Sequence, residues 1–95
     1  MVVGVSVLEL HLPAARSLKD KRRVVKALIE RMYQRHRVSV AETGLHDLHQ
    51  RAEVGIAVVG KSDSEVEFLL EDLRRLLDEL PEAVVTRWEP QLLEG

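Results

Sequence analysis

Apolar and polar positions divide the chain into two similar halves. The first half opens with an apolar, β-branched run, Val2–Leu12, which predicts a largely buried strand that ends at Pro13. A helix is expected next, capped by Ser17 with Asp20 three residues further on, and running to about His36. Its apolar stripe predicts the face that packs on a sheet: Leu18, Val25, Leu28, Ile29 and Met32.

Two further strands are predicted before the second half begins. A short strand is expected at Val38–Glu42, followed by a loop over Thr43–His49 that contains a glycine. The next segment, Arg51–Val59, alternates apolar residues with smaller or polar ones, which is typical of a strand with one buried face. Gly60 is expected to end that strand.

The second half repeats the plan of the first. Ser62 and Glu65 form an S-x-x-E capping box before a leucine-rich helix that Pro81 ends. A last strand is predicted over Ala83–Glu89, and residues 90–95 are expected to form a loose tail.

The order of these elements, βαββαβ, predicts the fold class. It is the order of ferredoxin-like α+β domains, with a four-stranded antiparallel sheet and both helices on one face. With 95 residues the chain is too short for a second core, so we expect one domain over residues 1–95. It has no cysteine, no apolar run of membrane-spanning length and no basic leader after Met1, so we expect an unprocessed cytoplasmic protein.

Charge is unevenly distributed along the chain, although the net charge is only -2. Residues 16–51 carry ten Lys and Arg against four Asp and Glu, or +6, whereas residues 52–95 carry four against eleven, or -7. An overall acidic chain does not coat nucleic acid indiscriminately, but a local basic patch can still attract phosphate to one surface.

The basic residues gather around the start of the first helix. In a ferredoxin-like fold this helix start lies at the same end of the domain as the loop before the third strand. Cations there oppose the helix dipole, and a bound anion would relieve that conflict. The candidate anion- or RNA-binding residues are Arg16, Lys19, Lys21, Arg22, Arg23, Lys26 and Arg51. Two alternatives remain open: Lys21 and Arg22 pair internally with Glu9, Glu42 or Asp47, or the more outward cations simply form a solvated face.

Three segments carry a resemblance to a known family. They are SLKDKRRVVKALIERM at Ser17–Met32, VSVAE at Val38–Glu42 and DLHQRA at Asp47–Ala52. Together they resemble the YlxP-like family of small bacterial proteins of unknown function, although His49 stands where that family commonly has an aromatic residue. The resemblance implies a ferredoxin-like domain and, because such proteins are often encoded near genes for translation initiation and ribosome maturation, work near RNA or the ribosome.

No residue pattern indicates catalysis. The chain has no glycine-rich phosphate loop and no nucleophile elbow, and two of its serines are already accounted for as helix caps. His46 and His49 with Asp47 are a weak metal pattern, so neither a metal nor another cofactor is expected. The sequence therefore predicts a binding protein and not an enzyme.

The uncovered face of the sheet suggests self-association. In the first strand either alternation places mainly apolar residues on that face, and an exposed apolar sheet commonly marks an interface. The first and third strands contain no aromatic residue, so RNA binding by base stacking on the sheet is not expected. We therefore expect an accessory module that contacts RNA or the ribosome electrostatically, with a homo-oligomeric interaction module, a homodimer in its simplest form, as the alternative.

Overall fold

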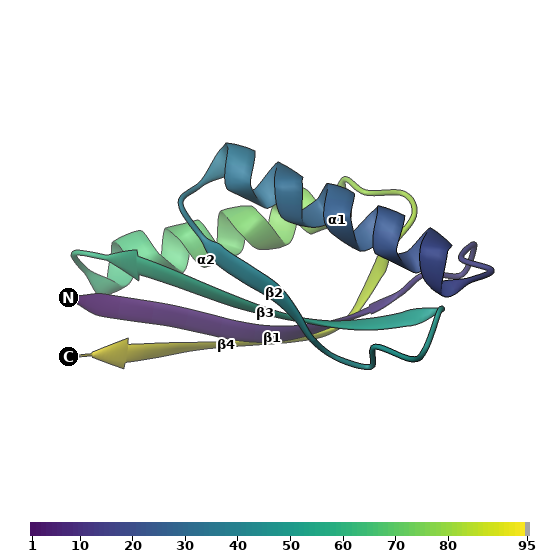
Figure 1. The fold of residues 1–95 in the computed structure, drawn as a ribbon. Coiled ribbons are helices and arrows are strands. Elements are labelled where there is room, and N and C mark those ends of the chain that lie inside the picture. The colour runs from purple at the N-terminus through teal and green to yellow at the C-terminus, as the bar shows by residue number, and fades with distance from the viewer. Residues whose placement is uncertain (95) are drawn as a thin grey trace.

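The computed structural model describes residues 1–94, which form six elements in the predicted order (Figure 1). In chain order these are β1 (Val2–His11), α1 (Leu18–Arg35), β2 (Ser39–Gly44), β3 (Arg51–Gly60), α2 (Asp63–Asp78) and β4 (Val84–Glu94). The two predicted helix starts are confirmed, because the hydroxyl oxygens of Ser17 and Ser62 accept hydrogen bonds from the amides of Asp20 and Glu65.

The four strands form one antiparallel sheet in the order β2-β3-β1-β4, and both helices lie over one of its faces (Figure 1). The two central strands pair over ten residues, from Val2 opposite Gly60 to His11 opposite Arg51. This architecture confirms the predicted ferredoxin-like α+β fold. In this arrangement β2 and β4 are the two edge strands, and one face of the sheet is not covered by the helices.

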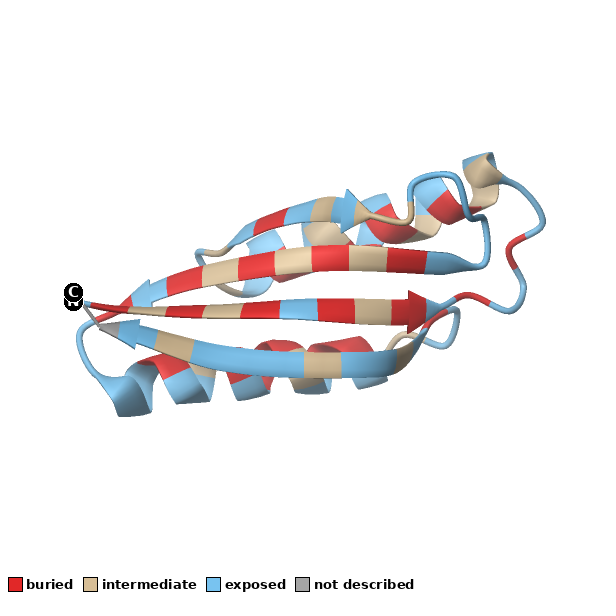
Figure 2. Cartoon of the chain, turned by 90° about the horizontal axis from the view of Figure 1, so that it is seen from below, coloured by how far each residue is buried: buried red, intermediate tan, exposed pale blue. Residues whose placement is uncertain are grey.

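The core lies between the sheet and the helices. Even-numbered residues of β1 and β3 point into it, and β1 alternates buried and more exposed positions along its length (Figure 2). Gly4 sits where β1 passes directly beneath α2. A Cβ atom there would lie 2.3 Å from Cγ1 of Val66, so only glycine permits this close approach.

The C-terminal segment differs from the prediction. Residues 90–94 do not form a loose tail, because β4 continues through them and pairs with the first residues of β1, from Ser6 opposite Pro90 to Val2 opposite Glu94. Pro90 is compatible with this position because an edge strand needs no donor on its outer side. Residue 95 lies outside the described part of the chain.

Among residues 1–94, no helix combines the length and the apolar character needed to cross a bilayer.

Candidate anion-binding surface

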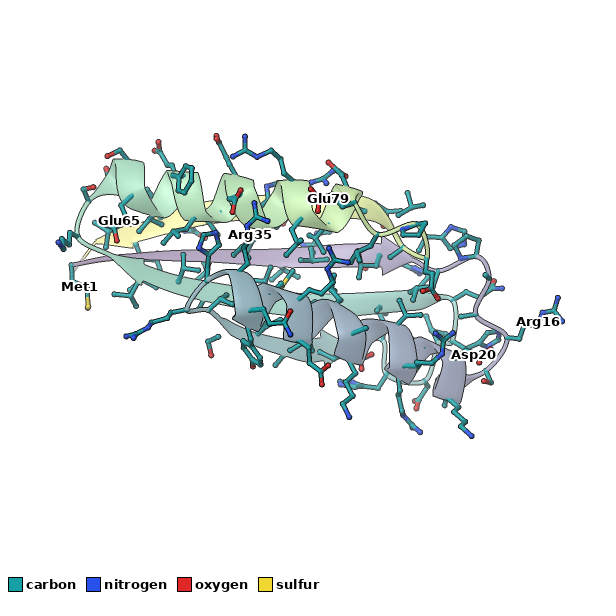
Figure 3. All side chains as sticks on the ribbon, turned by 90° about the horizontal axis from the view of Figure 1, so that it is seen from above. Met1, Arg16, Asp20, Arg35, Glu65 and Glu79 are labelled. Atoms are coloured by element: carbon teal, nitrogen blue, oxygen red, sulfur yellow. The ribbon has the colours of Figure 1, made fainter. Side chains whose placement is uncertain are left out.

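The N-terminus of α1 is closed by its own side chains. The Ser17 hydroxyl accepts from the Asp20 amide at 3.1 Å, and the Asp20 carboxylate accepts from the Arg16 amide at 3.0 Å. These bonds satisfy donors that a bound anion would otherwise use, and Asp20 supplies the negative charge that the helix dipole favours. Arg16 itself points away from the domain at this end of α1 (Figure 3).

Lys21 lies in the interior and not on the surface, with only 1% of its area exposed. Its ammonium donates to the carbonyl oxygens of Leu45 at 2.8 Å, Arg51 at 3.2 Å and His46 at 3.3 Å. The ammonium also forms an ion pair with Glu42, at 3.0 Å from Oε2, although this contact does not have the geometry of a hydrogen bond. The Lys21 ammonium is thus fully occupied by oxygen atoms of the protein and holds the 45–50 loop against α1. Lys21 is therefore not available as an anion ligand.

Two more predicted site residues already have acidic partners. Arg51 extends over the sheet face opposite the helices, where it pairs with Glu9 at 3.2 Å. The tertiary structure therefore separates it from the α1 cations. Arg23 lies 3.6 Å from Glu82 in a pair whose side chains are 66% and 53% exposed. An ion pair so exposed to solvent contributes little and is readily exchanged for another partner.

Lys19, Arg22 and Lys26 form what we call the basic row. They are spaced by three and four residues, so at 100° per residue they share the flank of α1 that faces away from α2. All three are exposed, and none forms an ion pair with any residue in the described range 1–94. At about 1.5 Å per residue the row extends about 10 Å along the helix.

A groove of about 350 Å³ lies between α1 and the edge strand β2, beside the basic row. Arg22 and Lys26 contribute to its rim, and apolar residues of α1 such as Ile29 line it. Tyr33 closes one part of the groove, with its ring half exposed and its hydroxyl donating to the Val40 carbonyl at 3.3 Å. The structure thus places an aromatic ring, two cations that form no ion pair within residues 1–94, and the carboxylates of Glu30 and Glu42 on one concave surface.

The histidines of the loop before β3 do not gather into a metal site. His46 is exposed, and its Nε2 lies 3.3 Å from the Glu42 carbonyl oxygen, while His49 and Asp47 are also exposed. Within residues 1–94 no group of three or more His, Cys, Asp or Glu side chains is placed to hold a metal ion.

A second charged cluster joins the two helices. Asp72 of α2 accepts hydrogen bonds from Nε of Arg35 at 3.0 Å and from an Arg35 terminal nitrogen at 3.3 Å, and its Oδ2 lies 2.6 Å from Nε2 of His36. Arg35 reaches from α1 toward α2 (Figure 3). The hydrogen bond with His36, followed by that with Arg35, lowers the pKa of Asp72. The only sequence signal for this cluster was the i,i+3 spacing of Asp72 and Arg75, which does not point to α1.

Comparison with known proteins identifies the family. Residues 3–89 match DUF503, described as a protein of unknown function. A Bacillus subtilis (strain 168) protein named "Uncharacterized protein YlxP" is 34% identical over 90 residues, which span 93% of this chain and 98% of that protein. The chain belongs to the DUF503 family. The resemblance expected from the first helix and the loop before β3 is therefore confirmed.

Solved structures support the fold of this DUF503 protein. The de novo designed protein Foldit4 aligns with a TM-score of 0.57 at 17% identity, covering 100% of this chain and 99% of that one. The solution NMR structure of LFR1 1, a designed protein with a ferredoxin fold, aligns with a TM-score of 0.54 at 17% identity, covering 100% and 87%. At this level of identity the likeness concerns the fold alone.

Proposed function

We propose that this DUF503 protein is a cytoplasmic accessory protein that binds RNA, on or near the ribosome, through the basic row of α1. Lys19, Arg22 and Lys26 contact phosphates, and Arg16 and Arg23 extend the positive surface at the start of the helix. The observation that carries the proposal is that the three row cations lie side by side without acidic partners in the described chain.

The electrostatic cost of this arrangement supports a negatively charged partner. A cation in the first turn of a helix, here Lys19, opposes the helix dipole by about 0.3–1 kcal/mol at an exposed site. The three row cations also repel one another, because like charges spaced by three or four residues on a helix are mutually destabilising. The chain neutralises Lys21 fully and Arg23 loosely, yet residues 1–94 supply no acidic partner to the neighbouring row cations. A nucleic-acid backbone would relieve this repulsion and release its own counterions.

The dimensions of the row suit a short stretch of backbone. The row of about 10 Å presents three cations in succession, which can contact up to three phosphates of one strand. The half-exposed ring of Tyr33 lies along the same groove, where an unpaired base could stack on it. Single-stranded RNA is therefore the form that the surface fits best.

The test is a titration of fluorescently labelled single-stranded and duplex RNA over a series of salt concentrations. Three phosphate contacts predict a slope of log K against log salt of about -2 for a single strand. The triple variant Lys19→Gln, Arg22→Gln, Lys26→Gln should reduce this slope to near zero. Wild-type protein should also sediment with ribosomes at low salt and be released at high salt.

A matched control removes three cations elsewhere. Arg31→Gln, Lys61→Gln, Arg75→Gln changes the net charge equally but leaves the basic row intact, so it should keep the wild-type slope. Equal losses in the two triple variants would show attraction by net charge alone. If wild-type protein binds no RNA and does not sediment with ribosomes, the proposal fails and the alternative of an interaction module without nucleic-acid binding is favoured.

A further inference from the structure

The sheet face without helices, which we call the open face, carries a continuous apolar patch. It is formed by outward side chains at the end of the sheet where β1 begins: Val3, Val5, Val7, Ala57, Val59 and Leu93. Val59 is 60% exposed, Leu93 46% and Val7 37%, so a single chain leaves much of the apolar surface of these side chains in contact with water. The face is seen directly in Figure 2, where no helix lies over it.

The patch has a ridge beside a furrow. Val3, Val5 and Val7 of β1 form the ridge. Two of these valines have smaller partners on β3, since Val5 lies opposite Ala57 and Val7 opposite Gly55, whereas Val3 lies opposite Val59 and closes the furrow at that end. A hollow of about 310 Å³ lies over these small residues, and Thr43 of β2 closes its far side. A Cβ on Gly55 would meet Cγ2 of Thr43 at 2.9 Å, so the glycine keeps the furrow open.

The two edges of the sheet are poorly suited to association. On β2 the carbonyl of Val40 already accepts from Tyr33, and the carbonyl of Glu42 lies 3.3 Å from the His46 ring nitrogen. On β4, Pro90 has no amide hydrogen to donate to another strand. Such features discourage edge-to-edge pairing, which leaves the open face as the apolar surface available for contact.

The charges at the other end of the open face are largely neutralised within the chain. Arg51 pairs with Glu9, and Arg87 pairs with Glu89 at 2.9 Å. With Glu53 included, this end carries a net charge of -1, which disfavours nucleic acid and allows a second copy to approach. It has the composition of the polar rim around an apolar contact.

We propose that the open face is a homodimer interface in which the valine ridge of each copy packs into the furrow of the other. A twofold axis running between β1 and β3 places the β1 ridge over the partner's β3, and the same contact is then made twice. The four strands hold 37 residues in all, 10 in β1, 6 in β2, 10 in β3 and 11 in β4, and present roughly 600 Å² of projected sheet. This is close to the roughly 800 Å² of accessible surface that each partner buries in a standard interface.

The test is sedimentation velocity over a concentration series, together with circular dichroism to verify folding. The molar mass derived from the sedimentation of the wild-type protein should be twice the chain mass of 10.8 kDa. Val5→Lys places a charge in the centre of the contact and should weaken the dimer by about 30-fold or more, since an unpaired interfacial charge costs at least about 2 kcal/mol. Leu48→Lys makes the same charge change on an exposed loop residue and should leave the dimer intact.

Ala57→Leu separates this geometry from nonspecific apolar contact. It adds apolar area but fills the furrow, so it should weaken a ridge-in-furrow dimer, whereas it would strengthen a nonspecific association. The proposal is overturned if wild-type protein is monomeric up to about 1 mM. It is also overturned if folded Val5→Lys protein remains dimeric, or if Ala57→Leu protein associates as tightly as wild type. None of these results depends on whether the basic row binds RNA.

Discussion

Replacing Lys21 with methionine tests whether this buried cation holds the fold together. Lys21→Met keeps most of the apolar stem but removes the ammonium that serves three carbonyl oxygens and Glu42. Removing one partner of a buried ion pair typically costs 3–5 kcal/mol. The carboxylate of Glu42 retains 18% exposure and can recover some hydration, so we expect the lower end, about 3 kcal/mol.

This loss should be visible by both chemical and thermal unfolding. Because 1 kcal/mol shifts Tm by about 4–8 °C in a domain of this size, Tm should fall by about 12–24 °C. Urea denaturation should show a lower midpoint with an unchanged m-value. Native-state hydrogen exchange should show faster exchange at the amides of the 45–50 loop, since the ammonium bonds to that loop from α1.

Two further variants decide the cause. Lys19→Met makes the same change at an exposed position two residues away and should cost no more than about 0.5 kcal/mol. Adding Glu42→Gln to Lys21→Met removes the orphaned charge and should recover part of the lost stability. A cost below about 1 kcal/mol for Lys21→Met, or no recovery in the double variant, would refute the assignment of Lys21 as a buried structural cation.

The remaining predictions concern the helix-helix cluster and the packing of β1. Asp72→Asn should destabilise the protein by about 1–3 kcal/mol at neutral pH because it weakens the hydrogen bonds to Arg35 and His36. Since the pKa of Asp72 is lowered in the folded state, its contribution is present above the ordinary value of 3.8 and is lost as pH falls through the folded pKa. Urea unfolding of both proteins should therefore show a stability difference that shrinks in acid. Gly4→Ala should cost about 1–3 kcal/mol, measured as a lower urea midpoint, because its methyl group would overlap Val66.

Each of these two predictions has a matched control. Asp78→Asn removes an exposed carboxylate that pairs with Arg74 of the same helix, so it should cost less than Asp72→Asn at neutral pH. A stability difference between wild type and Asp72→Asn that grows in acid would contradict the assignment. For the glycine, the control is the double variant Gly4→Ala, Val66→Ala. Its loss in free energy of unfolding should be smaller than the sum of the losses in the two single variants, because the smaller side chain at position 66 makes room for the added methyl group. Simple additivity of the two would contradict the overlap.

Local patterns in the sequence determined the secondary structure of this protein. An apolar, β-branched run located the first strand, period-2 alternation located the third, and period-3.6 spacing located the helices. Ser17 and Ser62 marked both helix starts, because caps depend on residues a few positions apart. The βαββαβ order then restricted the topology to the ferredoxin-like arrangement. The resemblance to the YlxP-like family likewise followed from contiguous segments of the sequence.

The tertiary structure alone decided what each charged residue does. Lys21 and Lys19 look alike in the sequence. The ammonium of Lys21 donates to carbonyl oxygens of the 45–51 segment, whereas Lys19 forms no ion pair with any part of the chain that the structure describes. Arg51 belongs to the opposite face from the basic row, and residues 90–94 are held by β1. These outcomes depend on partners dozens of residues away. Only the crossing of helix and sheet brings such groups within hydrogen-bonding distance, so no local spacing could predict them.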